Sequence, residues 1–232
     1  MLSISGFQKA FEYINLIEQG MICTLSLSAL TVLFGFILAL FLAICRLSNI
    51  KVAKFLATVY VEVLRATPLL VQLFIVYNIL LAGVSLPKFK VFGFIRFERF
   101  LPGVIALSLN SAAYLSEIIR SGIQSIDHGQ TEAARSLGMT QVQNMRYIVL
   151  PQAIKNILPA IANEFVTIIK ESSICSVLGM QEIMFNTKLV QGATFRPAEP
   201  LIIAAILYFC LTFPTSKVIQ YFERRMRRGD VR

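Results

Sequence analysis

Polar side chains stand at helical spacing inside two long apolar stretches, residues 101–119 and 148–169. Spacings of three and four residues place side chains on one face of a helix. Polar groups inside a membrane usually face the bundle interior or a watery path. Pro159 can bend the second stretch and free backbone groups toward a cavity. We therefore predict that both stretches form the walls of a solute pathway, with these lining residues: Asn110, Tyr114 and Glu117 in the first, and Asn163, Glu164 and Thr167 in the second.

The same side chains also have a structural explanation, which stays open. Asn110 and Asn163 could hydrogen-bond between helices, and Glu164 could pair with Lys155 or Lys170.

The elements that must position these residues are membrane-spanning helices. The chain has 232 residues, of which 56% are apolar and 15% charged, and its mean hydropathy is +0.69. Such a composition lies outside the soluble norm, and runs of about 20 apolar residues can cross the hydrocarbon core as helices. We predict an all-α integral membrane protein with one transmembrane domain over 1–232. Its five predicted spans are about 21–45, 60–86, 101–119, 148–169 and 198–218.

The second span has an uncertain start, because polar residues interrupt it. Glu62 and Arg65 are three residues apart and are expected to pair with each other near the inner surface. Thr67 and Pro68 are expected to break the helix locally.

Lys and Arg in short loops predict the orientation. Basic residues follow the first span and fill the C-terminal tail: Arg46, Lys51, Lys54, Arg224, Arg225, Arg227, Arg228 and Arg232. Both regions are predicted to be cytoplasmic, which puts the N-terminus outside. The loop after the second span disagrees with this orientation, because it would be outside and yet has four basic residues and one acidic residue: Lys88, Lys90, Arg96, Arg99 and Glu98. The net charge of +9 is interpreted as membrane-surface charge rather than as a nucleic-acid site.

The chain lacks the sequence motifs of several enzyme classes. There is no GxxxxGK[ST] phosphate loop, no HExxH and no GxSxG, and His128 is the only histidine. The four cysteines are widely separated, without metal-ligand spacing, and are expected to be packing residues. No cleavable signal peptide is evident. The chain is therefore predicted to be neither an enzyme nor a metal protein.

A polar segment, EAARSLGMTQVQNMRYIVLP, lies between the third and fourth predicted spans. A capping pattern at Thr131 predicts a short helix to about Met139, lying along the cytoplasmic surface, and Gly138 offers its end. Leu137 and Ala134 are expected to share one side of this helix, with Arg135 and Glu132 exposed.

The spacing of this segment resembles the EAA loop of ABC importer permeases. It has Glu132-Ala133-Ala134, then three residues, Gly138, nine residues, Ile148, one residue, and Leu150-Pro151. The segments YVEVLRATPLLVQLF, SAAYLSEIIRSGIQSIDHGQ and LPQAIKNILPAIANEFVTIIKESSICSVLG also resemble the polar amino-acid uptake branch of that family. Together the similar segments cover roughly 61–179.

The resemblance implies a type I ABC importer permease with a cytoplasmic coupling loop over 128–147. Its coupling residues would be Glu132, Ala133, Ala134 and Gly138. Ala133 and Ala134 would permit close packing in a partner groove, and Gly138 a sharp exit that a side chain would obstruct. Pro151 would start the fourth span at a first-turn position, so that motion of the docked helix reaches that span directly.

The resemblance also implies the function and the partners. The chain would be the membrane-spanning subunit of an ATP-driven importer for polar amino acids, with Glu164 accepting an ammonium or a cationic side chain. ATP and Mg²⁺ would be bound by separate ATPase subunits, and no cofactor by this chain. The other expected partners are a second permease subunit, identical or closely related, an extracytoplasmic amino-acid-binding protein and the lipid bilayer of the bacterial inner membrane. The alternatives are a permease for another small solute, a structural membrane subunit and, least favoured, a membrane enzyme.

Overall fold

The structure is a computed structural model that describes residues 2–227, so Arg228 and Arg232 of the predicted cytoplasmic tail lie outside it. It is helical apart from loops and one small antiparallel hairpin, in which Lys90 pairs with Arg96 and Val91 with Ile95. The elements are α1 Ile4–Phe11, α2 Ile14–Leu47, α3 Lys51–Ala66, α4 Leu69–Ile75, the π-helix Val76–Leu80, β1 Lys90–Val91, β2 Ile95–Arg96, α5 Phe97–Gln124, α6 His128–Ser136, α7 Gln141–Asn144, the π-helix Met145–Val149, α8 Leu150–Glu171, the 3₁₀-helix Ser172–Leu178, α9 Ile183–Thr194 and α10 Glu199–Arg227.

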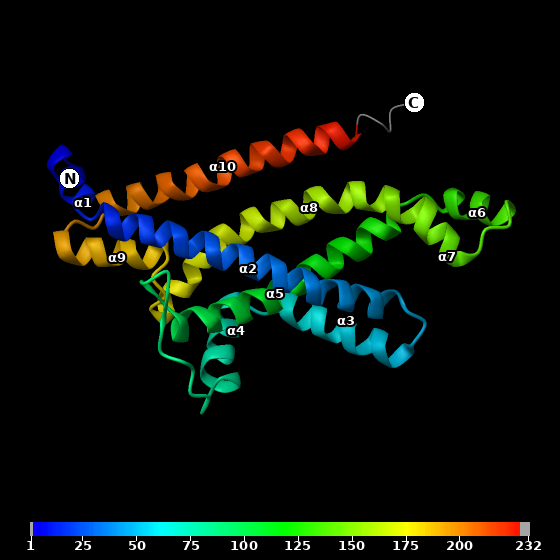
Figure 1. The fold of residues 1–232 in the computed structure, drawn as a ribbon, viewed down its shortest axis with the longest axis horizontal. Helices are drawn as coiled ribbons and strands as arrows, with labels where there is room; N and C mark the ends of the chain where they lie inside the picture. Colours follow the sequence, from blue (N-terminus) through cyan, green and yellow to red (C-terminus); the bar gives the residue numbers. More distant parts are fainter. Residues whose placement is uncertain (1, 228–232) are drawn as a thin grey trace.

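The bundle is elongated, and its helices run along the long axis (Figure 1). The N-terminus and α9 lie at one end, and α6 and α7 lie at the other. Within residues 2–227, α2, α5 and α10 are each long and apolar enough to cross a membrane. The broken pair of α3 and residues 69–79 qualifies as one further span. The predicted all-α membrane class is therefore confirmed.

The predicted fourth span, 148–169, coincides with α8, which lies against α2, α5 and α10 but does not qualify by composition. Its charged residues are Lys155, Glu164, Lys170 and Glu171. The count of five spans therefore stays a prediction.

The predicted helix break at Thr67 and Pro68 is present. Both residues have extended backbone, with ψ of 146° and 135°, and the helices on either side meet at 113°. Proline disfavours the α conformation for the residue before it, which explains why the helix ends at Ala66. The Gln72 side-chain amide donates to the carbonyls of Leu64 at 2.8 Å and Thr67 at 3.0 Å. It thereby satisfies groups that the break leaves without helical partners.

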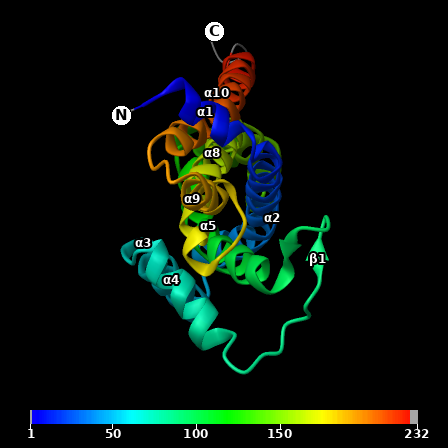
Figure 2. The ribbon, with the colours of Figure 1, turned by 90° about the vertical axis from the view of Figure 1, so that its left-hand side faces the viewer.

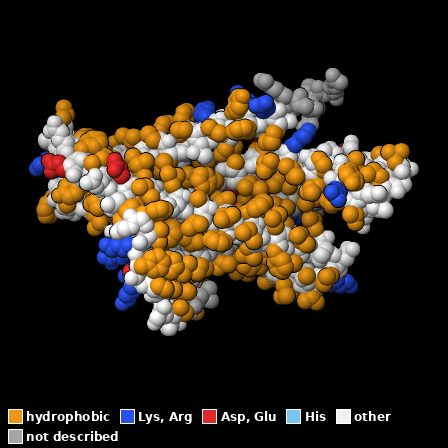
Figure 3. All heavy atoms as spheres, viewed as in Figure 1, with side chains coloured by type: hydrophobic (Ala, Val, Ile, Leu, Met, Phe, Trp, Pro, Cys, Tyr) orange, Lys and Arg blue, Asp and Glu red, His pale blue; other side chains and the backbone are white. Residues whose placement is uncertain are grey.

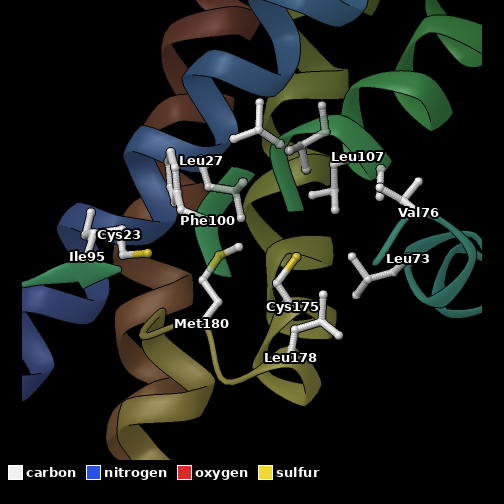
Figure 4. Close-up of a cluster of buried hydrophobic side chains, with 13 residues drawn as sticks. Cys23, Leu27, Leu73, Val76, Ile95, Phe100, Leu107, Cys175, Leu178 and Met180 are labelled. Atoms are coloured by element: carbon white, nitrogen blue, oxygen red, sulfur yellow. The ribbon is translucent and has the colours of Figure 1, made fainter. Parts of the chain in front are cut away.

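The core divides into two main apolar clusters that join α2 and α5 to other helices. In the first, Cys23 and Leu27 of α2 lie near Leu107 of α5, with Cys175 and Met180 close by (Figure 4). Cys23 and Cys175 are fully buried free thiols, which agrees with the predicted packing role, whereas Cys45 is partly buried and Cys210 is exposed within this chain.

The second cluster centres on alanines of α2 and α5, including Ala39, Ala112 and Ala113. Small residues allow helix backbones to approach closely in membranes. Apolar side chains also cover much of the visible surface (Figure 3).

Candidate coupling loop and polar pathway

The helix of the predicted coupling loop, α6, begins earlier than predicted, so the predicted cap at Thr131 is wrong. Its N-cap is Asp127, whose carboxylate accepts a hydrogen bond from the Gly129 backbone N–H at 2.6 Å. Aspartate is among the strongest N-cap residues, and its position ahead of Thr131 adds a turn to the helix. Thr131 instead accepts a hydrogen bond from the Asn144 side chain at 3.2 Å, which ties α6 to α7.

Gly138 ends α6 as predicted, but for a different reason. Its φ is +80°, and a Cβ built at this position would meet no atom within 4 Å. The backbone N–H groups of Gly138 and Met139 donate to the carbonyls of Arg135 at 2.9 Å and Ala134 at 3.1 Å. The left-handed backbone at position 138 therefore favours glycine. The prediction that a side chain here would obstruct the exit from the helix is wrong for contacts within this chain.

The two alanines of the motif have different environments. Ala134 is 3% exposed, because α6 packs on the following π-helix through this side, whereas Ala133 and Glu132 are exposed. Leu137 is 83% exposed, so the prediction that it shares a side with Ala134 is wrong. The exposed face of α6 and its C-cap therefore carry the Glu132 carboxylate, the Ala133 methyl group and the Leu137 isobutyl group.

Pro151 lies in the first turn of α8, as predicted, and a further helical path precedes it. Thr140 caps α7 in a reciprocal box with Gln143, and the chain continues through the π-helix Met145–Val149 into α8. A proline inside a helix donates no hydrogen bond and clashes with the preceding turn, and the wider π-turn accommodates it. The Asn144–Thr131 hydrogen bond thus connects α6 to one helical path that reaches Glu171.

The predicted pathway residues of α5 lie in three different environments. Asn110 is 6% exposed and donates to the Gln72 side chain at 2.9 Å, which joins α5 to the broken helix. Tyr114 is 39% exposed, with the Arg65 guanidinium 5.5 Å from its ring centre. Glu117 belongs to an ionic cluster. Of the three residues, Tyr114 has the largest exposed fraction.

The ionic cluster joins α2, α3 and α5, and sequence reasoning missed it. Glu117 accepts from Arg46 at 2.7 Å and from Arg120 at 2.5 Å, and Arg65 lies 3.8 Å away. The ion pair of Arg65 among the described residues is therefore with Glu117, so the predicted Glu62–Arg65 pair is wrong. Glu117 and Arg120 could be matched by helical spacing, but the 71-residue separation from Arg46 gave no local signal.

The predicted residues of α8 remain accessible at the bundle surface. Asn163 is exposed, and Glu164 and Thr167 are partly exposed. The Thr167 hydroxyl donates to the Asn163 carbonyl at 3.3 Å, within the helix. Ser111 of α5 lies beside Glu164, and its buried hydroxyl is placed to donate a hydrogen bond to that carboxylate. The ion pairs found among residues 2–227 do not include one between Glu164 and Lys170.

A buried carboxylate at the other end of the bundle was also missed. Glu182 is fully buried and caps α9 by accepting from the backbone of Met184 at 2.8 Å and Phe185 at 2.6 Å. It also accepts from the Tyr208 hydroxyl of α10 at 2.9 Å. Burial raises the pKa of this carboxyl to about 7. The described residues hold no group of three or more His, Cys, Asp or Glu side chains that could bind a metal ion.

Comparison with known protein families gives a match that covers the segments described above. Residues 21–228, which include α6 and the polar helices, match the family described as binding-protein-dependent transport system inner membrane component. The chain belongs to this family.

Relatives of this inner membrane component are similar over nearly their full length. The arginine transport system permease protein ArtQ of Bacillus subtilis is 40% identical, over 97% of this chain and 98% of its own. A putative glutamine transport system permease protein GlnP of Rickettsia conorii is 38% identical, over 94% and 96%. The nopaline transport system permease protein NocM of Agrobacterium fabrum is 40% identical, over 86% and 83%.

Solved structures agree with this assignment. A chain of an amino acid ABC transporter crystallised with histidines has 46% identity and a TM-score of 0.88, over 97% of this chain and 100% of its own. The MetNI methionine ABC transporter, in inward facing conformations, shares the fold at a TM-score of 0.69 and 18% identity. The resemblance based on the EAA spacing is confirmed.

Proposed function

We propose that this inner membrane component is the membrane-spanning permease subunit of an ATP-driven importer for polar amino acids. The observation that carries the proposal is the near full-length similarity to permeases named for arginine, glutamine and nopaline transport. These three solutes are all polar amino acids or their conjugates. A permease for another small solute is the alternative, and a ligand screen on the purified complex distinguishes the two.

The proposed power source is a separate ATPase subunit that holds ATP and Mg²⁺ and docks on α6. Support comes from the exposed face of Glu132, Ala133 and Leu137, and from the helical path that begins at Gln141 beside it. Movement of the ATPase subunits would pull α6, and the Asn144–Thr131 hydrogen bond would transmit that movement to α8. The pathway would then alternate between its two openings.

A second permease subunit is proposed to cover the polar face of α8. Asn163 and Lys170 are exposed, and Glu164 is partly exposed, on a helix that packs among candidate spans. Polar groups in contact with hydrocarbon are costly, whereas polar groups beside a water-filled path are tolerated. Two identical permeases facing each other through α8 would enclose such a path between them.

The proposed orientation places the α6 end in the cytoplasm and the N-terminus outside. The two ends of the described chain lie toward opposite ends of the bundle, and the C-terminal end of α10 points in the direction of α6 (Figure 1). The extracytoplasmic binding protein would then deliver its amino acid at the end that carries α1 and α9.

Glu164 is proposed to accept the ammonium or the cationic side chain of the substrate. It is partly exposed and lies beside the Ser111 hydroxyl of α5, between two helices of the proposed pathway. An ionised carboxylate at this depth needs water, a cation or a ligand to offset the loss of its hydration.

The test is Glu164→Gln in the complete complex reconstituted in liposomes, with the exposed Glu62→Gln as a matched control. We expect the first variant to raise the concentration needed for half-maximal uptake, most strongly for cationic amino acids, while complex assembly is retained. The control should leave uptake unchanged. Uptake with unchanged concentration dependence in a fully assembled Glu164→Gln complex would rule out the binding role. A loss of folded yield that removal of Lys155 or Lys170 restores would instead assign Glu164 to a structural pair.

A further inference from the structure

Two exposed phenylalanines have an unusual backbone conformation. Within residues 2–227, the non-glycine residues with positive φ are Phe92 at 53° and Phe195 at 54°. Their side chains are 67% and 89% exposed, respectively. Bulky side chains disfavour the left-handed region, and residues that adopt it often have a functional reason. Neither ring is buried within this chain in return for that strain.

Both phenylalanines lie directly ahead of a candidate membrane span. Phe92 is at the tip of the β1–β2 hairpin, just before α5 begins at Phe97, and Phe195 ends α9, just before α10 begins at Glu199. Both helices begin at the end of the bundle opposite α6 (Figure 1). The hairpin and the α9–α10 connection lie on different flanks of that end (Figure 2). The two segments that carry these rings therefore lie on separate flanks and do not form one continuous surface.

Basic and aromatic neighbours accompany Phe92, and a basic neighbour follows Phe195 in the sequence. Phe89 is 50% exposed and stacks on Phe97, with ring centres 4.5 Å apart. Lys90 and Arg96 are neighbours across the hairpin ladder. In Figure 3, basic and hydrophobic side chains gather together at the lower left, where this segment lies. Arg196 follows Phe195 and lies 3.5 Å from the Glu199 carboxylate.

We propose that Phe92 and Phe195 anchor this end of the permease in the lipid headgroup layer, with neighbouring basic side chains contacting anionic lipid phosphates. Aromatic residues are enriched at the membrane–water interface, and Lys and Arg extend from it to the headgroups. Burial of each ring in the interface offsets its backbone strain. Placement on separate flanks, each next to a span, fits a lipid layer that surrounds the bundle better than a protein docked on its end.

This assignment also accounts for the loop that disagreed with the predicted orientation. Lys90 and Arg96 would lie on the outer side, where contact with anionic headgroups would offset the general preference of basic residues for the cytoplasmic side.

The experiment uses tryptophan as a reporter, because the chain contains none. Phe92→Trp and Phe195→Trp permeases are assembled with their ATPase subunits in liposomes whose phospholipid chains carry bromine near the glycerol end. The emission of the unsubstituted complex is subtracted. Leu137→Trp on α6, which is 83% exposed but lies at the proposed ATPase interface, is the control.

We expect brominated lipid to remove most of the emission of both phenylalanine variants and little of that of Leu137→Trp. Bromine placed at the far end of the lipid chains should quench the two reporters less. In liposomes containing anionic lipid, adding Lys90→Gln and Arg96→Gln should lower the quenching of Phe92→Trp to its value in purely zwitterionic lipid. Quenching of Phe195→Trp should not change.

Two results would overturn the proposal. One is an absence of quenching for both reporters in assembled complexes. The other is an emission shift that appears when the binding protein is added, without prior quenching by lipid, because it would assign the rings to a protein interface. If Phe92→Trp fails to assemble, Phe89→Trp, at a neighbouring side chain that is 50% exposed, provides the same comparison for the hairpin.

Discussion

Replacing Gly138 with alanine is expected to weaken ATPase docking through backbone strain alone. The φ of +80° lies in the left-handed region, and a Cβ at this position meets no atom within 4 Å. A left-handed conformation costs an L-residue about 1–2 kcal/mol. Because the exposed loop can relax when the ATPase is absent, this cost should appear as roughly 5- to 30-fold weaker docking.

Asparagine provides the matched variant, because it tolerates the left-handed region better than alanine although its side chain is larger. Docking is measured as the affinity of purified ATPase subunits for permease held in lipid nanodiscs, with transport-coupled ATP hydrolysis as a second readout. We expect the order Gly138, then Gly138→Asn, then Gly138→Ala. The reasoning is refuted if alanine binds as well as glycine. It is also refuted if asparagine binds more weakly than alanine, because side-chain size at the docked interface would then decide the affinity.

Two further predictions concern packing between helices and are checked by thermal unfolding of the purified permease. Arg46→Gln should destabilise the protein by about 1.5–3 kcal/mol, the usual range for a hydrogen bond to a charged group, because Arg46 is 2.7 Å from Glu117 and its side chain is 10% exposed. Arg65→Gln should cost less, since Arg65 is 3.8 Å away and 44% exposed, and equal losses would contradict this. Gly122→Ala should cost about 1–3 kcal/mol by overpacking, because its Cβ would lie 2.3 Å from Ile157 Cγ1. Ile157→Ala should make that substitution less costly, and strict additivity would argue against the contact.

Local signals in the sequence predicted much of the fold. The apolar runs indicated the membrane helices, and Thr67-Pro68 indicated the break, because proline constrains the backbone on both sides of it. Gly138 was expected at the end of the helix now seen as α6, and it lies there, although its left-handed backbone rather than steric obstruction is the reason. The cap of that helix was misplaced because Asp127 and Thr131 are both good N-cap residues, and propensity alone could not choose between them.

Contacts between distant residues could not be predicted in this way. Arg46 and Asn110 each find partners on other helices, Glu117 and Gln72, through tertiary packing that no local spacing encodes. The candidate pathway residues were identified by the cost of polar groups in a membrane. That cost does not distinguish a helix–helix hydrogen bond from a binding site, so Asn110 and Glu164 looked alike in sequence. In the structure, Asn110 is 6% exposed and hydrogen-bonded to another helix, whereas Glu164 is partly exposed at the surface of the bundle.

The most direct test of the account is ATP-driven uptake by the complete complex in liposomes, with ATP supplied to only one side. The proposed mechanism predicts that a labelled polar amino acid accumulates against its gradient only when ATP and the ATPase subunits are on the α6 side and the binding protein is on the other. Glu132→Lys, on the exposed face of α6, should abolish this accumulation while leaving the permease in the membrane. Accumulation without ATP, with ATP on the opposite side only, or at full rate in the Glu132→Lys complex would contradict the proposal that ATPase motion enters the permease through α6.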